Sequence, residues 1–202
     1  FNFHEPYMYL MAKTDFEMDL GLYSEGILSR KWKTEFRPKP ENLTEIPEAE
    51  WRERVKKGYY DIVIAHNEPN AWDLKDAPCP KILVCHNKKT FIKTLLPKSD
   101  LSAIESYEKN IEFLSKVYAF VFISYLKQDD YNIPGYVVLP GIDVEEYGGY
   151  TGEIPRILRV GNYMYERNWM FDVQFQEAVC AGLPFQVMGE NPRIPNSKPS
   201  TS

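Results

Sequence analysis

The sequence predicts an α/β protein built on a doubly wound parallel sheet. Short apolar runs rich in β-branched and aromatic residues alternate with segments of helical periodicity. Continuous apolar runs are typical of strands that are covered on both faces. Strands that alternate with helices indicate parallel pairing with right-handed crossovers. A length of 202 residues, 44% of them hydrophobic, is enough for one domain and part of a second.

The first part of the chain predicts a strand end, a helix and a further strand. Residues 1–3 (FNF) resemble the last residues of a strand whose first residues are expected to be missing. The chain then turns at His4-Glu5-Pro6 into a helix. A second strand is expected at 15–21. Residues 35–46 are expected to form a loop, because their prolines disfavour a helix.

Two helices and four strands follow. A helix is expected at 47–58, with proline near its start and glycine at its end. Another is expected at 99–117, where apolar residues recur on one stripe. The strands are expected at 61–65, 81–85, 119–123 and 136–139.

Composition excludes several classes of function. A net charge of -5 and a pI of about 5.4 do not favour nucleic acid binding. The three cysteines have no regular spacing, so neither a disulfide framework nor a zinc site is expected, and a reducing cytoplasm fits. The sequence contains neither a run of 18 apolar residues nor a signal peptide pattern. We therefore expect a cytoplasmic protein, and leave open a place at the inner membrane face.

Candidate site residues follow the predicted strands. In an open α/β sheet, ligands bind beyond the carboxyl ends of the strands. All three histidines of the protein lie at such positions, which favours a shared cleft. No pair has the spacing of a helical His-x-x-x-His ligand set, so no metal is expected. The cleft residues expected from this rule are His4, Glu5, His66, Asn67, Glu68, His86, Asn87 and Ser124.

Four segments together resemble a known enzyme family. "YDIVIAHNEPNA", "KILVCHNK", "AFVFISYLKQDD" and "VVLPGIDVEEY" follow one another at short spacings. Their order is similar to the N-terminal half of a retaining (group 1) glycosyltransferase of the two-domain GT-B fold, which uses sugar nucleotides. The resemblance implies a Rossmann-like acceptor-side domain at 1–143, a linker at 144–155 and the start of a donor-binding domain at 156–202.

The resemblance also implies site residues and substrates. His86 would be the catalytic residue and would face the donor sugar. Gly161 and Arg167 would contact the diphosphate, whereas Asn162 replaces a basic residue that the family usually has. The substrates would be a nucleotide sugar and a carbohydrate, lipid-linked or small-molecule acceptor, with no further cofactor. Lys88 and Lys89 leave open a peripheral membrane contact.

The second predicted domain departs from the family pattern. A strand is expected at 156–160, a helix at 166–182 and a strand at 183–191, but residues 168–202 contain no Glu-x7-Glu element. We therefore expect hexosyl transfer by the intact protein and no activity from this chain alone. Two alternatives stay open. One is a sugar-nucleotide epimerase on the same frame, and the other is a non-catalytic α/β module that binds carbohydrate or protein.

Overall fold

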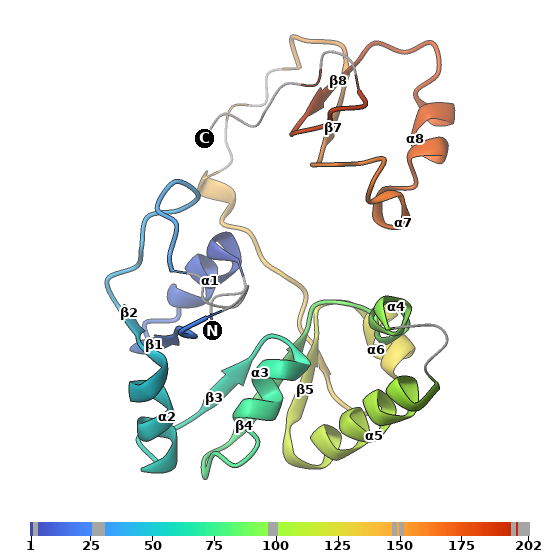
Figure 1. Cartoon of the computed structure of the whole chain (residues 1–202). Coiled ribbons are helices and arrows are strands. Elements are labelled where there is room, and N and C mark those ends of the chain that lie inside the picture. The colour runs from blue at the N-terminus through green and yellow to red at the C-terminus, as the bar shows by residue number, and fades with distance from the viewer. Residues whose placement is uncertain are drawn as a thin grey trace. The chain divides into compact units, whose positions relative to one another are not determined.

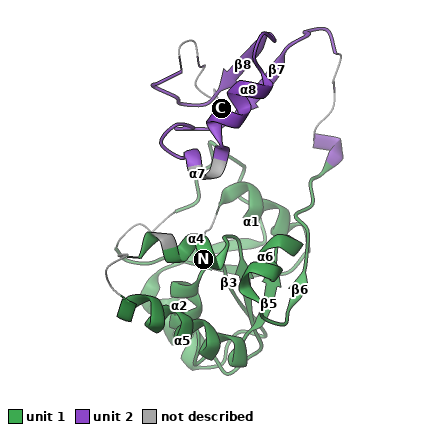
Figure 2. Cartoon of the chain, turned by 90° about the vertical axis from the view of Figure 1, so that its right-hand side faces the viewer, with its two compact units in different colours: residues 1–143 green, residues 144–202 purple. Residues whose placement is uncertain are grey.

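The chain divides into two compact units, residues 1–143 and 144–202 (Figure 2). The computed structural model describes residues 1, 4–25, 31–96, 101–146, 149, 152–194 and 197. Each unit contains its own parallel strands and its own buried apolar cluster. The two units are therefore considered one at a time.

The main feature of the first unit is a four-stranded parallel sheet. Its strands are β3 (Val63–Ala65), β4 (Lys81–Cys85), β5 (Ala119–Phe122) and β6 (Tyr136–Val137), and they lie in that order. Figure 1 shows β3, β4 and β5 side by side. Each strand falls within an apolar run that predicted it, and every pairing is parallel. The predicted α/β class with a parallel sheet is thus confirmed.

Helices connect these strands. The longest is α5 (Leu101–Val117), in the place of the helix expected at 99–117; residues 99 and 100 lie outside the described residues. Three shorter helices complete the connections, namely α3 (Glu68–Asp73), α4 (Lys89–Leu95) and α6 (Tyr125–Tyr131). The alternation of strand and helix keeps all strands parallel and brings their carboxyl ends to one edge.

The core of this unit lies between the sheet and α5. Phe120 and Phe122 of β5 are fully buried and share one apolar cluster with Ile111 and Leu114 of α5. Gly135 allows β6 to pack closely here. A Cβ atom at that position would lie 2.6 Å from the Phe120 carbonyl oxygen and 2.7 Å from the Phe122 ring. The apolar stripe of α5 therefore packs against the sheet and holds β5 in place.

The N-terminal part of the unit forms a second, smaller sheet. Strands β1 (Met18–Gly21) and β2 (Leu43–Ile46) pair in parallel, preceded by α1 (Glu5–Ala12) and followed by α2 (Glu48–Lys56). The expectation of a loop throughout 35–46 is wrong, because its last four residues form β2. Leu43 and Ile46 are both buried, and the pairing with β1 supplies the strand geometry that the local pattern does not.

The second unit contains strands β7 (Ile157–Val160) and β8 (Phe185–Met188), paired in parallel. A single turn of 3₁₀ helix, η1 (Val144–Glu146), precedes them. One continuous helix was expected at 166–182, and that expectation is wrong. The structure has two short helices, α7 (Asn168–Phe171) and α8 (Val173–Val179).

The break between α7 and α8 is at Asp172. This residue has a φ of 46°, in the left-handed region that helices do not use. The Asn168 side-chain oxygen accepts a hydrogen bond from the Val173 amide at 2.7 Å, which satisfies a donor at the start of α8. Asp is among the residues that tolerate this conformation best, so the break needs no glycine.

Candidate functional site

Two of the predicted histidines meet at the carboxyl edge of the four-stranded sheet. His66 directly follows β3 and His86 directly follows β4. The two strands are parallel neighbours, so both exits lie at the same edge. His66 Nδ1 lies 3.1 Å from His86 Nε2, which is hydrogen-bonding distance. The structure therefore brings together two residues that are 20 positions apart in the sequence.

An aromatic ring from α1 covers the histidine pair. The Tyr7 ring contacts both imidazoles edge to face, with centroid distances of 5.6 Å to His66 and 4.9 Å to His86. His66 is buried, whereas His86 is half-buried, so only His86 presents an appreciable surface. His4, the third predicted histidine, is exposed and precedes α1.

Both histidines of the pair are neutral at pH 7. Burial is the main cause that holds the pKa of His66 well below its ordinary value, with smaller contributions from the Phe1 amino group and from His86. Burial, followed by the charges of His4 and Lys127, lowers the pKa of His86 to about 4. One neutral ring donates its N–H to the other, and the tautomers decide which ring donates. The pair therefore acts through hydrogen bonds and not as a positive charge.

The predicted Glu68 has a different environment from the one expected. Its carboxylate accepts hydrogen bonds from the Tyr107 hydroxyl at 3.0 Å and the Tyr131 hydroxyl at 2.8 Å. These tyrosines belong to α5 and α6. Burial and the Glu68 charge raise the pKa of both phenols, so they remain protonated donors at neutral pH. Glu68 thus links α3 to α5 and α6, and its carboxylate is engaged in these two hydrogen bonds.

Asn67 and Glu5 also have structural partners. The Asn67 side-chain oxygen accepts a hydrogen bond from the Asn70 amide at 2.9 Å and so caps α3. Glu5 is buried, and one of its carboxylate oxygens accepts a hydrogen bond from the Lys33 amide at 3.3 Å. Both residues stabilise the backbone around the strand ends.

The remaining strand-end residues lie closer to solvent. Asn87 is exposed beside His86, and Ser124 is half-buried at the start of α6. Lys88 is exposed, but Lys89 turns inward: its ammonium donates to the Tyr131 carbonyl oxygen at 3.2 Å. Only part of the predicted basic pair therefore presents its charge to solvent.

In the second unit, Gly161 and Arg167 share one aromatic ring. A Cβ atom at Gly161 would lie 2.6 Å from the Phe171 ring, and the Arg167 guanidinium carbon is 5.6 Å from that ring's centroid. The Gly161 amide donates to the Met188 carbonyl oxygen at 3.0 Å. A larger residue at this position would have to displace the Phe171 ring, and the Gly161 N–H continues the strand pairing.

Asn162 follows directly and fixes the end of β8. Its side-chain oxygen accepts a hydrogen bond from the Glu190 amide at 2.7 Å. The Asn191 side chain donates to the Gly161 carbonyl oxygen at 2.7 Å and accepts from the Met164 amide at 2.9 Å. These bonds hold the β7 exit loop against the β8 exit.

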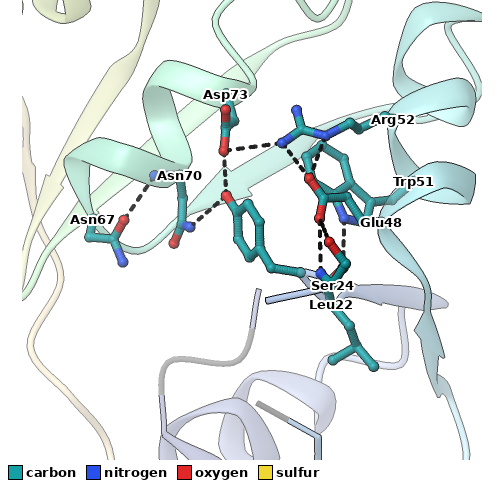
Figure 3. Close-up of polar contacts among 9 residues, drawn as sticks. Leu22, Ser24, Glu48, Trp51, Arg52, Asn67, Asn70 and Asp73 are labelled. Atoms are coloured by element: carbon teal, nitrogen blue, oxygen red, sulfur yellow. Dashed lines mark hydrogen bonds and ion pairs between the residues drawn. The ribbon is translucent and has the colours of Figure 1, made fainter. Parts of the chain in front are cut away.

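A polar network at the β1 exit was missed by sequence reasoning. Ser24 donates from its amide and its hydroxyl to Glu48, at 2.9 and 2.8 Å, and Arg52 Nε donates to the other carboxylate oxygen at 2.8 Å (Figure 3). Tyr23 donates to Asp73 of α3 at 2.6 Å. The strand-exit rule would have found Tyr23 and Ser24, had it been applied to the strand that ends at Gly21.

The network ties the β1 exit to α2 and α3. Figure 3 shows Arg52 of α2 between Glu48 and Asp73, and the Arg52–Asp73 ion pair spans 3.7 Å. The Ser24 and Arg52 hydrogen bonds lower the pKa of Glu48 to about 2. Glu48, Arg52 and Asp73 are all paired within this network, which favours a stabilising role.

Within the described ranges, no group of three or more His, Cys, Asp or Glu residues is placed to bind a metal ion. No helix among the described residues is long and apolar enough to cross a bilayer. In comparisons with known proteins, the sequence matches no family model and no curated protein.

Proposed function

We propose that the chain forms the acceptor side, and the beginning of the donor side, of a retaining glycosyltransferase that uses a nucleotide sugar. The observation that carries the proposal is the contact between His66 and His86 beneath Tyr7, at the carboxyl edge of a parallel sheet. This edge is where open α/β sheets bind their ligands. The order of the motifs that resemble the GT-B family adds independent support.

The chemistry of the pair suits a sugar hydroxyl. A neutral imidazole can donate one hydrogen bond and accept another, as a hydroxyl can. His86 has a pKa near 4, so it is a weak base at pH 7 and its role is to orient the sugar by hydrogen bonding. Tyr7 supplies an apolar surface beside the pair, as sugar sites commonly require.

The second unit supplies the proposed diphosphate contact. Arg167 has a guanidinium group that remains charged at all relevant pH values and whose planar fork matches phosphate oxygens. It lies seven residues after the last residue of β7, over the Phe171 ring that also packs against Gly161. In the proposed reaction the bond from the anomeric carbon to the diphosphate oxygen breaks and the nucleoside diphosphate leaves. The acceptor oxygen forms the new bond on the same face, and its hydroxyl proton passes to the leaving diphosphate.

A nucleotide-release assay tests the proposal. The protein is incubated with a panel of nucleotide sugars, with and without sugar acceptors, and free nucleoside diphosphate and modified sugar are measured. Diphosphate release that depends on an acceptor supports glycosyl transfer. A changed sugar without an acceptor would instead indicate an epimerase. Saturable sugar binding with neither product would indicate a binding module.

A further inference from the structure

A buried arginine lies in the first strand of the second unit. Arg159 belongs to β7 and is only 7% exposed, whereas its neighbours Leu158 and Val160 are 57% and 66% exposed. Side chains alternate between the two faces of a strand, so Arg159 points away from solvent. Its register partner on the adjacent β8 (Figure 1) is Val187, which belongs to the buried apolar cluster of this unit. Arg159 thus occupies a position where the strand pattern predicts an apolar side chain.

The guanidinium group of Arg159 has neutral partners. Its Nε donates a hydrogen bond to the Gln176 side-chain oxygen at 2.8 Å, and its Nη2 lies 3.8 Å from the Met164 sulfur. Its central carbon lies 5.7 Å from the centroid of the Phe185 ring. Within the described part of the second unit, no ion pair includes Arg159. No carboxylate of these residues therefore neutralises its charge by direct contact.

A buried guanidinium group without a counter-charge is costly. Hydrogen bonds to neutral groups return only part of the free energy that is lost when the ion leaves water. A lysine in such a place could lose its proton, but an arginine stays charged at every relevant pH. Arg159 therefore carries a permanent positive charge, and an anion bound nearby would stabilise it.

Arg159 lies next to the loop that follows β7. Met164, which contacts its Nη2, belongs to this loop. The charge of Arg159 also acts one residue further along, at the Tyr165 hydroxyl. The hydrogen bond to Glu177 is the main cause that raises the pKa of Tyr165, and the charges of Arg193 and Arg159 oppose this rise. An anion bound at the β7 exit loop would therefore experience the charge of Arg159.

Two residues connect Arg159 to the proposed diphosphate contact. The Gln176 side-chain nitrogen donates to the Phe171 carbonyl oxygen at 2.5 Å, so its side-chain oxygen is left to face Arg159. The Phe171 ring in turn contacts both the Arg167 guanidinium and the space where a Cβ atom of Gly161 would lie. The path from Arg159 to Arg167 thus passes through Gln176 and Phe171 alone.

We propose that Arg159 is a positioning residue for a diphosphate bound at the β7 exit loop. It acts through the loop and does not touch the ligand, because its guanidinium group is buried. Its charge attracts the diphosphate, and the bound diphosphate supplies the negative charge that Arg159 lacks. Salt screens a buried charge only weakly, so this attraction persists at physiological ionic strength. The inference rests on the diphosphate contact proposed for Arg167 and adds a second cation to it.

Two substitutions separate the charge of Arg159 from its hydrogen bond. Arg159→Gln removes the charge but retains a donor for Gln176, whereas Arg159→Lys retains both the charge and a donor. Isothermal titration calorimetry measures the affinity of the parent protein and of both variants for inorganic pyrophosphate, UDP, GDP and ADP. Circular dichroism measures the midpoint of thermal unfolding of each protein without ligand. Arg167→Ala is the reference for loss of a direct contact.

Arg159→Gln is expected to bind pyrophosphate at least about fivefold more weakly than the parent protein, because a positive charge near the ligand is lost. Arg159→Lys is expected to bind within about twofold of the parent protein, since the charge remains. Without ligand, the unfolding midpoint of Arg159→Gln should equal or exceed that of the parent protein, because a buried charge is removed.

Three outcomes would overturn the inference. Pyrophosphate binding that Arg159→Gln leaves unchanged would overturn it and leave the contact proposed for Arg167 intact. A lower unfolding midpoint of Arg159→Gln, or equal losses of affinity in Arg159→Gln and Arg159→Lys, would assign Arg159 a structural role. A parent protein that binds neither pyrophosphate nor any of the three nucleotides would overturn both this inference and the proposed diphosphate contact.

Discussion

His66 and His86 are held together as neutral rings, and this has a measurable effect on stability. Both have a pKa below the ordinary value because burial disfavours the imidazolium form. In the unfolded chain the same side chains bind protons near pH 6.5. As the pH falls below 6.5, the unfolded state therefore takes up protons that the folded state excludes, and the first unit loses stability.

Replacing His86 by Gln should reduce this loss. With a folded-state pKa of about 4, His86 should contribute about 1–2 kcal/mol to the decrease in unfolding free energy between pH 7 and pH 5. Urea unfolding at both pH values measures the decrease. The matched control is His4→Gln, because His4 is exposed. This variant should retain most of the decrease in unfolding free energy between pH 7 and pH 5. If the unfolding free energy of His86→Gln fell as much as that of the parent protein, protonation of His86 would not be the cause of the decrease.

The same residue is expected to matter for catalysis. If His86 orients the reacting sugar, its contact strengthens in the transition state, so His86→Ala should lower turnover more than it lowers donor affinity. His66→Ala should affect turnover less, provided that circular dichroism shows it folded, because His66 is only 3% exposed. Near-normal turnover in His86→Ala beside a large loss in folded His66→Ala would assign the role to the other histidine.

Arg167 gives a residue-scale test in the second unit. Removing a charge-assisted contact costs about 1.5–3 kcal/mol, so Arg167→Ala should weaken binding of the nucleoside diphosphate roughly ten- to a hundred-fold. Isothermal titration calorimetry measures the affinity. Arg156→Ala serves as the control, because Arg156 is an exposed arginine just before β7. Equal affinities of the two variants would contradict the proposed contact between Arg167 and the diphosphate.

At the scale of the elements, long apolar runs were the reliable signal. The segments that predicted β3, β4 and β5 each contain at least four consecutive apolar residues, as expected of strands inside a covered sheet. Each could therefore be recognised without knowing its neighbours. β2 was missed, since only Leu43 and Ile46 of its four residues are apolar and its strand form depends on pairing with β1. The break at Asp172 was missed because a left-handed aspartate leaves no strong local pattern.

The site was predictable to a similar degree. The strand-exit rule placed His66 and His86 at one edge, and they are in contact. The same rule could not show that Glu68 turns toward Tyr107 and Tyr131, because those tyrosines come from helices far along the chain. The strand-exit rule thus predicts where the backbone brings residues together. It does not predict side-chain partners, because these depend on tertiary packing between segments far apart in the sequence.

The junction of β1, α2 and α3 should carry an acid-sensitive part of the stability. Hydrogen bonds from Ser24 and Arg52 lower the pKa of Glu48 to about 2, so this carboxylate stabilises the fold fully above its unfolded pKa near 4.5. That contribution is lost as the pH falls from about 4.5 toward 2. Glu48→Gln should be less stable at pH 7 and should show a shallower loss in that window.

Chemical unfolding between pH 7 and pH 2 measures this effect. Glu53→Gln is the matched control, because Glu53 lies on the same helix, is exposed and forms an ion pair with Lys57 at 3.0 Å. A Glu48→Gln variant with the same stability and the same acid profile as the parent protein would show that the network of Figure 3 contributes nothing.

At the scale of the whole molecule, the two proposed binding sites belong to different units. The first unit contributes the histidine pair at the edge of its four-stranded sheet. The second contributes the β7 exit loop with Gly161 and Arg167. Each site is formed within its own unit, so each can be tested by its own ligand: a sugar for the first unit and a nucleoside diphosphate for the second.

The central claim is that the histidine pair binds a sugar. The protein contains three histidines, so imidazole NMR signals of histidine-labelled protein can be followed one by one while a panel of sugars and nucleotide sugars is added. The account predicts saturable shifts of the His66 and His86 signals with at least one sugar, and a smaller shift for the exposed His4. Signals of His66 and His86 that stay unchanged across the whole panel, in folded protein, would contradict it.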